Sequence, residues 1–201
     1  MKNEILKDWL PIVLASASPR RAALLEEIGM AFETVPGKVG ETTADYLSPV
    51  ELALLNARNK AQAVAVKYPN RLVLGADTVV CLGHKVFGKP ASLAVAKSFL
   101  KQLQGRSHRV ITGVCLTCRQ RRRERLFAVD TTVRFRRLTP RQIAEYLQKV
   151  NPLDKAGAYA IQEHGEMIVE EISGSYTNVV GLPVERLQEE LAAMARVPEK
   201  C

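Results

Sequence analysis

The sequence from position 72 to position 82 reads Leu72-Val73-Leu74-Gly75-Ala76-Asp77-Thr78-Val79-Val80-Cys81-Leu82. Most of these residues are apolar and many are β-branched, which predicts a buried strand in the centre of a sheet. Asp77 is the exception, because a carboxylate inside an apolar strand is costly unless it is paired, hydrogen-bonded or bound to a metal. This segment therefore predicts both the middle of the fold and a candidate site within it.

Strand and helix patterns continue outward from this segment in both directions. We expect further strands at residues 12–15, 32–35, 109–118, 126–136 and 166–172, and helices at residues 19–29, 49–68, 92–104, 139–150 and 183–195. Strands and helices alternate early, and a long antiparallel pair follows in the middle. The pattern predicts an α/β protein with a mixed twisted sheet flanked by helices. We expect a single domain over residues 1–201, with its core at about 12–191.

Composition excludes several classes of protein. The 201 residues are 47% apolar and 25% charged, which is ordinary globular composition and excludes a disordered chain. No stretch approaches the roughly 18 apolar residues of a membrane span, and no signal-peptide pattern opens the sequence, so we expect a soluble, cytoplasmic protein. The four cysteines are too few and too scattered for a disulfide framework, and we expect reduced thiols.

The net charge of +8 comes from 29 Lys and Arg against 21 Asp and Glu, and it suggests an anionic partner. The block Arg119-Gln120-Arg121-Arg122-Arg123-Glu124-Arg125 holds five of the 29 basic residues. We expect it to form the turn between two strands. It could bind nucleic acid, but no aromatic residues interleave with it, so a solvated turn is the favoured interpretation.

Cys115-x-x-Cys118 has the spacing of half a zinc site. No second pair follows it, and His84, His108 and His164 share no ligand spacing. An odd separation along a strand places the two side chains on opposite faces, so we expect no zinc there.

Asp77 shares one face of its strand with Gly75 and Val79, because side chains alternate along a strand. Since glycine lacks a side chain, we expect open space beside Asp77, as in the wall of a ligand site. The alternative is a structural aspartate satisfied by the N-terminus of a neighbouring helix. We favour the functional interpretation.

A second candidate is Leu14-Ala15-Ser16-Ala17-Ser18-Pro19-Arg20-Arg21, which predicts a strand, a turn of small residues and a helix N-terminus. Free backbone N–H groups and the helix dipole make such a place an anion site. Arg20 and Arg21 oppose that dipole, which suggests that they serve a bound anion. A solvated helix start with surface arginines is equally consistent with these residues.

Other residues carry little information singly. Lys60 and Lys89 are more typical of surface lysines, and Glu41 of an exposed loop. The segment Asp154-Lys155-Ala156-Gly157-Ala158-Tyr159-Ala160-Ile161-Gln162 would let the backbone approach a ligand closely, but a tightly packed turn is slightly favoured.

Together, six motifs resemble the Maf family of nucleotide pyrophosphatases. In family order they are Leu14-Ala-Ser-Ala-Ser-Pro-Arg-Arg21, Ala57-Arg-Asn-Lys-Ala61, Gly75-Ala-Asp-Thr-Val79, Gly88-Lys-Pro90, Asp154-Lys-Ala-Gly-Ala-Tyr159 with Gln162, and Val180-Gly-Leu-Pro183. The resemblance implies two lobes around a central cleft, similar to inosine triphosphate pyrophosphatases. It also implies hydrolysis of a nucleoside triphosphate to the monophosphate and pyrophosphate, with Mg²⁺ or Mn²⁺ as cofactor.

The resemblance also implies roles for individual residues. Asp77 would activate water and, with Glu41, associate with the metal, while Arg20, Lys60 and Lys89 would hold the phosphates. The run around Gln162 resembles the branch acting on dTTP, UTP and modified pyrimidine nucleotides. A glutamine amide offers both a donor and an acceptor, which suits thymine or uracil.

Arg20 and Thr78 match further positions linked to specificity, and Ser16 lies in the first motif as a substrate-binding candidate. The resemblance implies a homodimer as well. It implies nothing about the segment before Ile12 or the arginine block, and Gly40 stands where the family often has a second acidic residue. The alternative from another class is a nucleic-acid-binding or cell-division protein that uses the arginine block, with Asp77 structural.

Overall fold

The computed structural model describes residues 9, 11–37, 39–40, 42 and 46–196. Its strands are β1 (Ile12–Leu14), β2 (Phe32–Thr34), β3 (Val73–Leu82), β4 (Lys85–Phe87), β5 (Ser107–Cys118), β6 (Arg123–Phe135) and β7 (Val169–Ser173). The helices are α1 (Pro19–Glu27), α2 (Pro49–Ala65), α3 (Leu93–Leu103), α4 (Pro140–Lys149), α5 (Tyr176–Val180) and α6 (Val184–Arg196), with short 3₁₀ turns η2 (Ala156–Ala158) and η3 (Gly165–Met167).

All the strands belong to one mixed sheet with the order β2-β1-β3-β5-β6-β7, and β4 pairs with β3 as a short hairpin. β1 is parallel to both β2 and β3, whereas the pairs β3–β5, β5–β6 and β6–β7 are antiparallel. The expected α/β class with a mixed sheet is therefore confirmed. Asp77 lies on the central strand β3, directly opposite Gly113 on β5.

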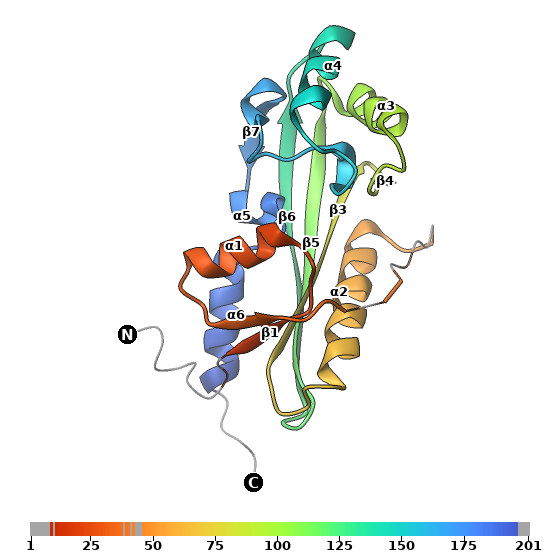
Figure 1. Cartoon of the computed structure of the whole chain (residues 1–201). Coiled ribbons are helices and arrows are strands. Elements are labelled where there is room, and N and C mark those ends of the chain that lie inside the picture. Colours follow the sequence, from red (N-terminus) through yellow and green to blue (C-terminus); the bar gives the residue numbers. More distant parts are fainter. Residues whose placement is uncertain (1–8, 10, 38, 41, 43–45, 197–201) are drawn as a thin grey trace.

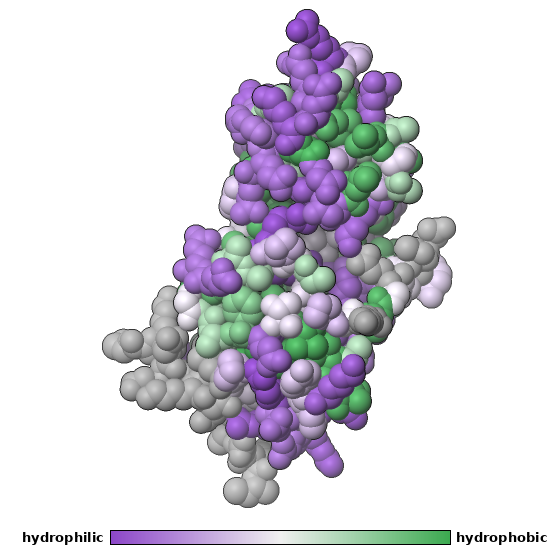
Figure 2. Space-filling model, in the orientation of Figure 1, coloured by the Kyte–Doolittle hydropathy of each residue, from purple (hydrophilic) through white to green (hydrophobic). Residues whose placement is uncertain are grey.

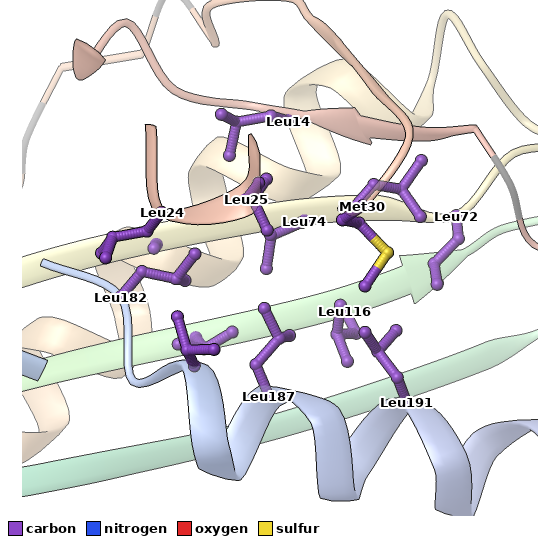
Figure 3. Packing of buried hydrophobic residues seen from close by; sticks show 14 of the residues in the cluster. Leu14, Leu24, Leu25, Met30, Leu72, Leu74, Leu116, Leu182, Leu187 and Leu191 are labelled. Atoms are coloured by element: carbon purple, nitrogen blue, oxygen red, sulfur yellow. The ribbon is translucent and has the colours of Figure 1, made fainter. Parts of the chain in front are cut away.

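Helices cover both faces of the sheet around β1 and β3. On one face, α2 packs its small residues, among them Ala57 and Ala61, against Val73 and Cys115. On the other face, α1 and α6 pack leucines against β3 and β5, and Figure 3 shows Leu187 and Leu191 of α6 facing Leu74 and Leu116. Alternation along β3 explains the two faces, because Val73 and Leu74 point to opposite sides.

The long strands β5 and β6 run the length of the molecule and join two lobes (Figure 1). One lobe holds β1, β2, α1, α2 and α6, and the other holds β4, α3, α4 and β7. The second lobe has its own core, in which Phe87, Phe135 and Tyr146 are fully buried. Hydrophilic side chains cover much of its surface in the view of Figure 2.

Local signals explain where the helices begin. Ser48 Oγ accepts from the Glu51 backbone N–H, and Glu51 Oε2 accepts from the Ser48 N–H, forming a capping box at α2. Thr139 and Gln142 repeat this arrangement at α4. Within the described residues, none of the helices has the length and apolar composition that crossing a bilayer requires.

The structure differs from several expected boundaries. α2 ends at Ala65 rather than near residue 68, consistent with the proline at position 69, which disfavours helix in the residue before it. The last strand begins at Val169, because His164 adopts a left-handed conformation (φ +55°) and opens the turn η3. The glycines at 83 and 88 and the proline at 90 left a hairpin or a loop open after the central strand, and β4 makes it a hairpin. α5 was not expected, since it is too short to show a period.

Candidate active site

A cleft of about 410 Å³ lies where the two lobes meet. Its walls include seven of the eight site residues expected from the sequence, namely Ser16, Arg20, Lys60, Asp77, Thr78, Lys89 and Gln162. The eighth, Glu41, lies outside the described residues. Residues that are far apart in the chain are thus brought to one place, which makes this cleft the candidate active site.

Asp77 lies at the bottom of the cleft with only 6% of its surface exposed. Lys60 Nζ donates to Asp77 Oδ1 at 2.6 Å, and Asn56 Nδ2 donates to Oδ2 at 3.3 Å. Both donors are side chains from the middle of α2. They satisfy the hydrogen-bonding capacity of the Asp77 carboxylate, rather than the helix N-terminus that was the alternative expected from the sequence. Lys60 is therefore no surface lysine, since its side chain is 13% exposed.

The expectation of open space at Gly75 is wrong. A Cβ at Gly75 would lie 2.4 Å from the Ala57 carbonyl oxygen of α2, and a Cβ at Gly113 would lie 2.4 Å from that of Ala53. The two glycines instead let the helix backbone lie directly on the sheet. This close approach brings α2 near Asp77, so Gly75 serves the site through packing rather than as a ligand wall.

Asn56 is a site residue that sequence reasoning missed. It is 4% exposed, and its Oδ1 accepts from the Thr42 N–H at 2.9 Å while its Nδ2 also reaches Asp77. Its only sequence signal is a polar side chain on the buried face of a helix, four residues before Lys60. That spacing places both side chains on the same face.

The two adjacent arginines at the start of α1 have different surroundings. Arg21 is 8% exposed and donates to Gly181 O at 2.8 Å, Ser16 Oγ at 2.9 Å and Thr78 Oγ1 at 3.0 Å. Thr78 Oγ1 also lies 2.9 Å from Thr112 Oγ1. Arg21 therefore ties together the first motif, the central strand and the loop after α5, and two expected site hydroxyls contact it.

Arg20 points instead across the cleft to the other lobe. Its Nη1 donates to Asp154 Oδ2 at 3.2 Å, and its Nη2 donates to the Asp154 carbonyl at 3.4 Å. Partial burial works to raise the pKa of Asp154, but hydrogen bonds from Lys155 and Arg20 outweigh it and lower that pKa. The ionised carboxylate thus links the arginine to the loop between α4 and β7.

Lys155, in the same loop, is a further residue that the sequence did not single out. Its side chain is 5% exposed and contacts three acceptors, Asn151 O at 2.8 Å, Asp154 Oδ1 at 3.0 Å and Glu163 Oε1 at 3.3 Å. The sequence signal that could have found it is the charged pair Asp154-Lys155 at the start of a segment of small residues.

The rest of this loop is packed as a tight turn, as the sequence slightly favoured. Gly157 has φ +71°, and a Cβ there would lie 3.0 Å from Val80. The Tyr159 hydroxyl lies 2.7 Å from His108 Nε2, and burial lowers the pKa of His108 to about 4. The imidazole is therefore neutral near neutral pH. Gln162, which precedes η3 in the same loop, is exposed and lines the cleft.

The arginine block lies away from the cleft. Only residues 119–122 form the turn, whereas Arg123 and Arg125 already belong to β6. Arg121 lies 4.4 Å from the ring centre of Trp9, and Arg123 donates to Met194 O at 2.9 Å. Two of the five arginines are thus used for packing.

The cysteine pair shows no sign of a zinc site. Cys115 and Cys118 are both buried in β5, and burial raises the pKa of Cys115 to about 12. Across the described residues, no group of three His, Cys, Asp or Glu side chains could hold a metal ion.

The cleft still fits a divalent metal that arrives with a substrate. Mg²⁺ commonly binds through one or two carboxylates together with substrate phosphates, rather than in a cage of protein ligands. Asp77 supplies one carboxylate at the bottom of the cleft, with cationic Arg20 and Lys89 on the same walls. This donor set is compatible with Mg²⁺ or Mn²⁺, for which Asp77 would supply a carboxylate.

A family model and individual relatives point to the same family of proteins. A family model described as Maf-like protein matches residues 11–194. A dTTP/UTP pyrophosphatase of Gloeobacter violaceus is 46% identical over 185 residues, which cover 92% of this chain and 96% of that protein. A dTTP/UTP pyrophosphatase of Carboxydothermus hydrogenoformans is 47% identical over 182 residues, which cover 90% of this chain and 97% of that protein.

A solved structure adds evidence on the fold alone. The structure of a HAM1 protein from Coxiella burnetii matches with a TM-score of 0.52 at 17% identity, covering 90% of this chain and 98% of that one. The α/β architecture of the two proteins is therefore shared across nearly their whole length.

Proposed function

The chain belongs to the Maf family, and from this premise we propose that it hydrolyses dTTP and UTP to the nucleoside monophosphate and pyrophosphate. The observation that carries the proposal is the buried Asp77–Lys60 pair, with its 2.6 Å contact, at the bottom of a cleft lined by further cations. A carboxylate kept in such a place is suited to proton transfer, and the surrounding cations are suited to a polyphosphate.

Binding of the phosphates is assigned to the cationic wall. Arg20, at the N-terminus of α1, and Lys89, in the loop after β4, face the same cleft from opposite lobes. The N-terminus of α1 adds the positive end of a helix dipole, which has the right polarity for an anion. Together these groups neutralise the charge that develops on the pyrophosphate as it leaves.

Activation of water is assigned to Asp77. In this proposal Asp77 accepts a proton from the water that attacks the α-phosphorus, and the bond to the bridging oxygen of the leaving pyrophosphate breaks. Lys60 and Asn56 each donate to one carboxylate oxygen, which fixes the orientation of the base. A carboxylate held in a fixed orientation by two hydrogen bonds is ready to accept a proton from a water that attacks in line with the leaving pyrophosphate.

A divalent cation is part of the proposal, with Asp77 and Glu41 as the residues that would hold it. When bound, it would neutralise phosphate charge and polarise the phosphoryl oxygens. Lys60 donates to Asp77 Oδ1 at 2.6 Å and holds that carboxylate in place.

Selection of the pyrimidine base is assigned to Gln162. Its exposed amide in the cleft can accept from the N3–H and donate to a keto oxygen of thymine or uracil. The family resemblance links Arg20, in the first motif, and Thr78, next to Asp77, to the same selection, and both residues line the cleft.

The family resemblance also supports a homodimer located in the cytoplasm, with the whole chain acting as one domain. Size-exclusion chromatography with light scattering tests the dimer, since a monomeric mass at micromolar concentration would contradict it.

The test is a nucleotide panel with Mg²⁺ or Mn²⁺, in which dTTP, UTP, CTP, dATP, GTP and 7-methyl-GTP are incubated and monophosphate and pyrophosphate are quantified. We expect selective turnover of dTTP and UTP. Asp77→Asn should lower it by about 10²–10⁴-fold. Asp130→Asn, at an exposed carboxylate on β6, is the matched control and should change little.

Two results would contradict the proposal in different ways. Turnover of 7-methyl-GTP in place of dTTP and UTP would keep the enzyme class but refute the assignment of Gln162. Absence of pyrophosphate from every nucleotide with either metal would refute the hydrolase assignment itself.

A further inference from the structure

The loop between α4 and β7 carries both the proposed base-reading residue and the partner of a proposed phosphate-binding residue. Gln162 lies in its second half, before η3, and Asp154, which accepts from Arg20, lies near its start. These two positions must be placed correctly at the same time, because base and phosphates belong to one ligand. The structure shows which side chain connects them.

Lys155 contacts Asp154 itself and the residue next to Gln162. Its ammonium donates to Asp154 Oδ1 at 3.0 Å and lies 3.3 Å from Oε1 of Glu163, the residue directly after Gln162. Its third contact is the Asn151 carbonyl at 2.8 Å. An ammonium has three donors, so these three protein acceptors use its full capacity. Lys155 is therefore committed to the loop, although it lines the cleft.

The segment that carries Gln162 is held on both sides. On one side, the Tyr146 hydroxyl bonds both the N–H and the C=O of Ala160, at 3.1 and 3.2 Å. On the other side, Glu163 is held by Lys155. Because adjacent Cα atoms are only about 3.8 Å apart, displacement of Glu163 displaces Gln162 as well.

We propose that Lys155 is a positioning residue for substrate selection, which sets Gln162 through Glu163 and Arg20 through Asp154. This inference rests on the proposed function and extends it, because it assigns base discrimination to a charge network rather than to Gln162 alone. The network spans the cleft, from Arg20 in one lobe to the loop of the other.

The test compares Lys155→Met, which keeps the length of the side chain and removes its charge, with the wild type. The kcat/KM values for dTTP and CTP are measured in each. We expect Lys155→Met to lower kcat/KM for dTTP by about ten- to a hundredfold and to lower the dTTP-to-CTP ratio. Lys101→Met, at an exposed lysine of α3, is the matched control and should leave both values unchanged.

A second background separates positioning from general stability. In Gln162→Ala, Lys155→Met should reduce the dTTP-to-CTP ratio little further, because the residue through which Lys155 acts is already absent. An equal loss for every nucleotide in both backgrounds would overturn the proposal.

Glu163→Gln tests the same contact without a substitution in the buried core, since the Glu163 side chain is 43% exposed. It should also lower the dTTP-to-CTP ratio while leaving the thermal unfolding temperature near that of the wild type. An unchanged ratio in this variant would overturn the proposal even if Lys155→Met failed to fold. A wild type that hydrolyses no nucleotide would instead refute the proposed function.

Discussion

Gly113→Ala adds a single methyl group at a point where α2 lies directly on the sheet. The new Cβ would lie 2.4 Å from Ala53 O and 2.5 Å from its carbonyl carbon, whereas real Cβ contacts begin at 3.0–3.4 Å. Both neighbours are backbone atoms of α2, so no side chain can rotate out of the way. We expect the helix to move away from β5 by about 0.6–1.0 Å.

This movement reaches Asp77 and Lys60, the proposed catalytic pair, because Gly113 lies directly opposite Asp77 in the sheet. The contact between Lys60 Nζ and Asp77 Oδ1 would lengthen from 2.6 Å to about 3.2–3.6 Å, beyond a normal charge-assisted hydrogen bond. We expect kcat/KM for dTTP to fall by about ten- to a hundredfold. Overpacking should lower the free energy of unfolding by about 1–3 kcal/mol, or about 2–12 °C in Tm.

The assay combines pyrophosphate release with thermal unfolding of the same preparation. Gly165→Ala is the matched control, because a Cβ there would meet its nearest neighbour at an ordinary 3.7 Å. Wild-type activity and Tm in Gly113→Ala would refute the claim that close packing of α2 positions Lys60. A lowered Tm with unchanged kcat/KM would show that the packing matters for folding and not for the site.

Two further predictions concern buried polar groups. Burial lowers the pKa of His108 from 6.5 to about 4, so the unfolded chain binds more protons in this range and stability should fall by up to about 3 kcal/mol as the pH falls from 6.5 to 4. Urea unfolding of wild type and His108→Gln across this range tests it, and identical pH dependence in both would contradict it. Arg21→Lys should cost about 2–4 kcal/mol, because Gly181 O, Ser16 Oγ and Thr78 Oγ1 cannot all keep their donor. A loss below about 0.5 kcal/mol in chemical denaturation would show that these contacts are replaceable.

Local patterns in the sequence determined most of the secondary structure. The apolar run around Asp77 predicted the central strand, and the capping boxes at Ser48 and Thr139 marked where two helices begin. These features depend on neighbours within a few residues, so the sequence shows them directly. The short helix α5 was missed, since five residues carry no readable period.

The sequence also indicated which residues form the site, through Asp77 as an anomaly and through the ordered family motifs. It did not show what each of them contacts. Taken singly, Lys60 was expected to be a surface lysine, and Gly75 was expected to leave open space beside Asp77. The packing of α2 on the sheet contradicts both expectations, because it buries Lys60 and fills the space at Gly75.

Only the tertiary structure decided the contacts that make the site work. Lys60 and Asp77 are 17 residues apart, and Arg20 and Asp154 are 134 residues apart. Whether such groups meet depends on helix-to-sheet spacing and on the placement of one lobe against the other. A difference of 1 Å in that spacing decides whether a hydrogen bond forms, and no local periodicity of the chain encodes it.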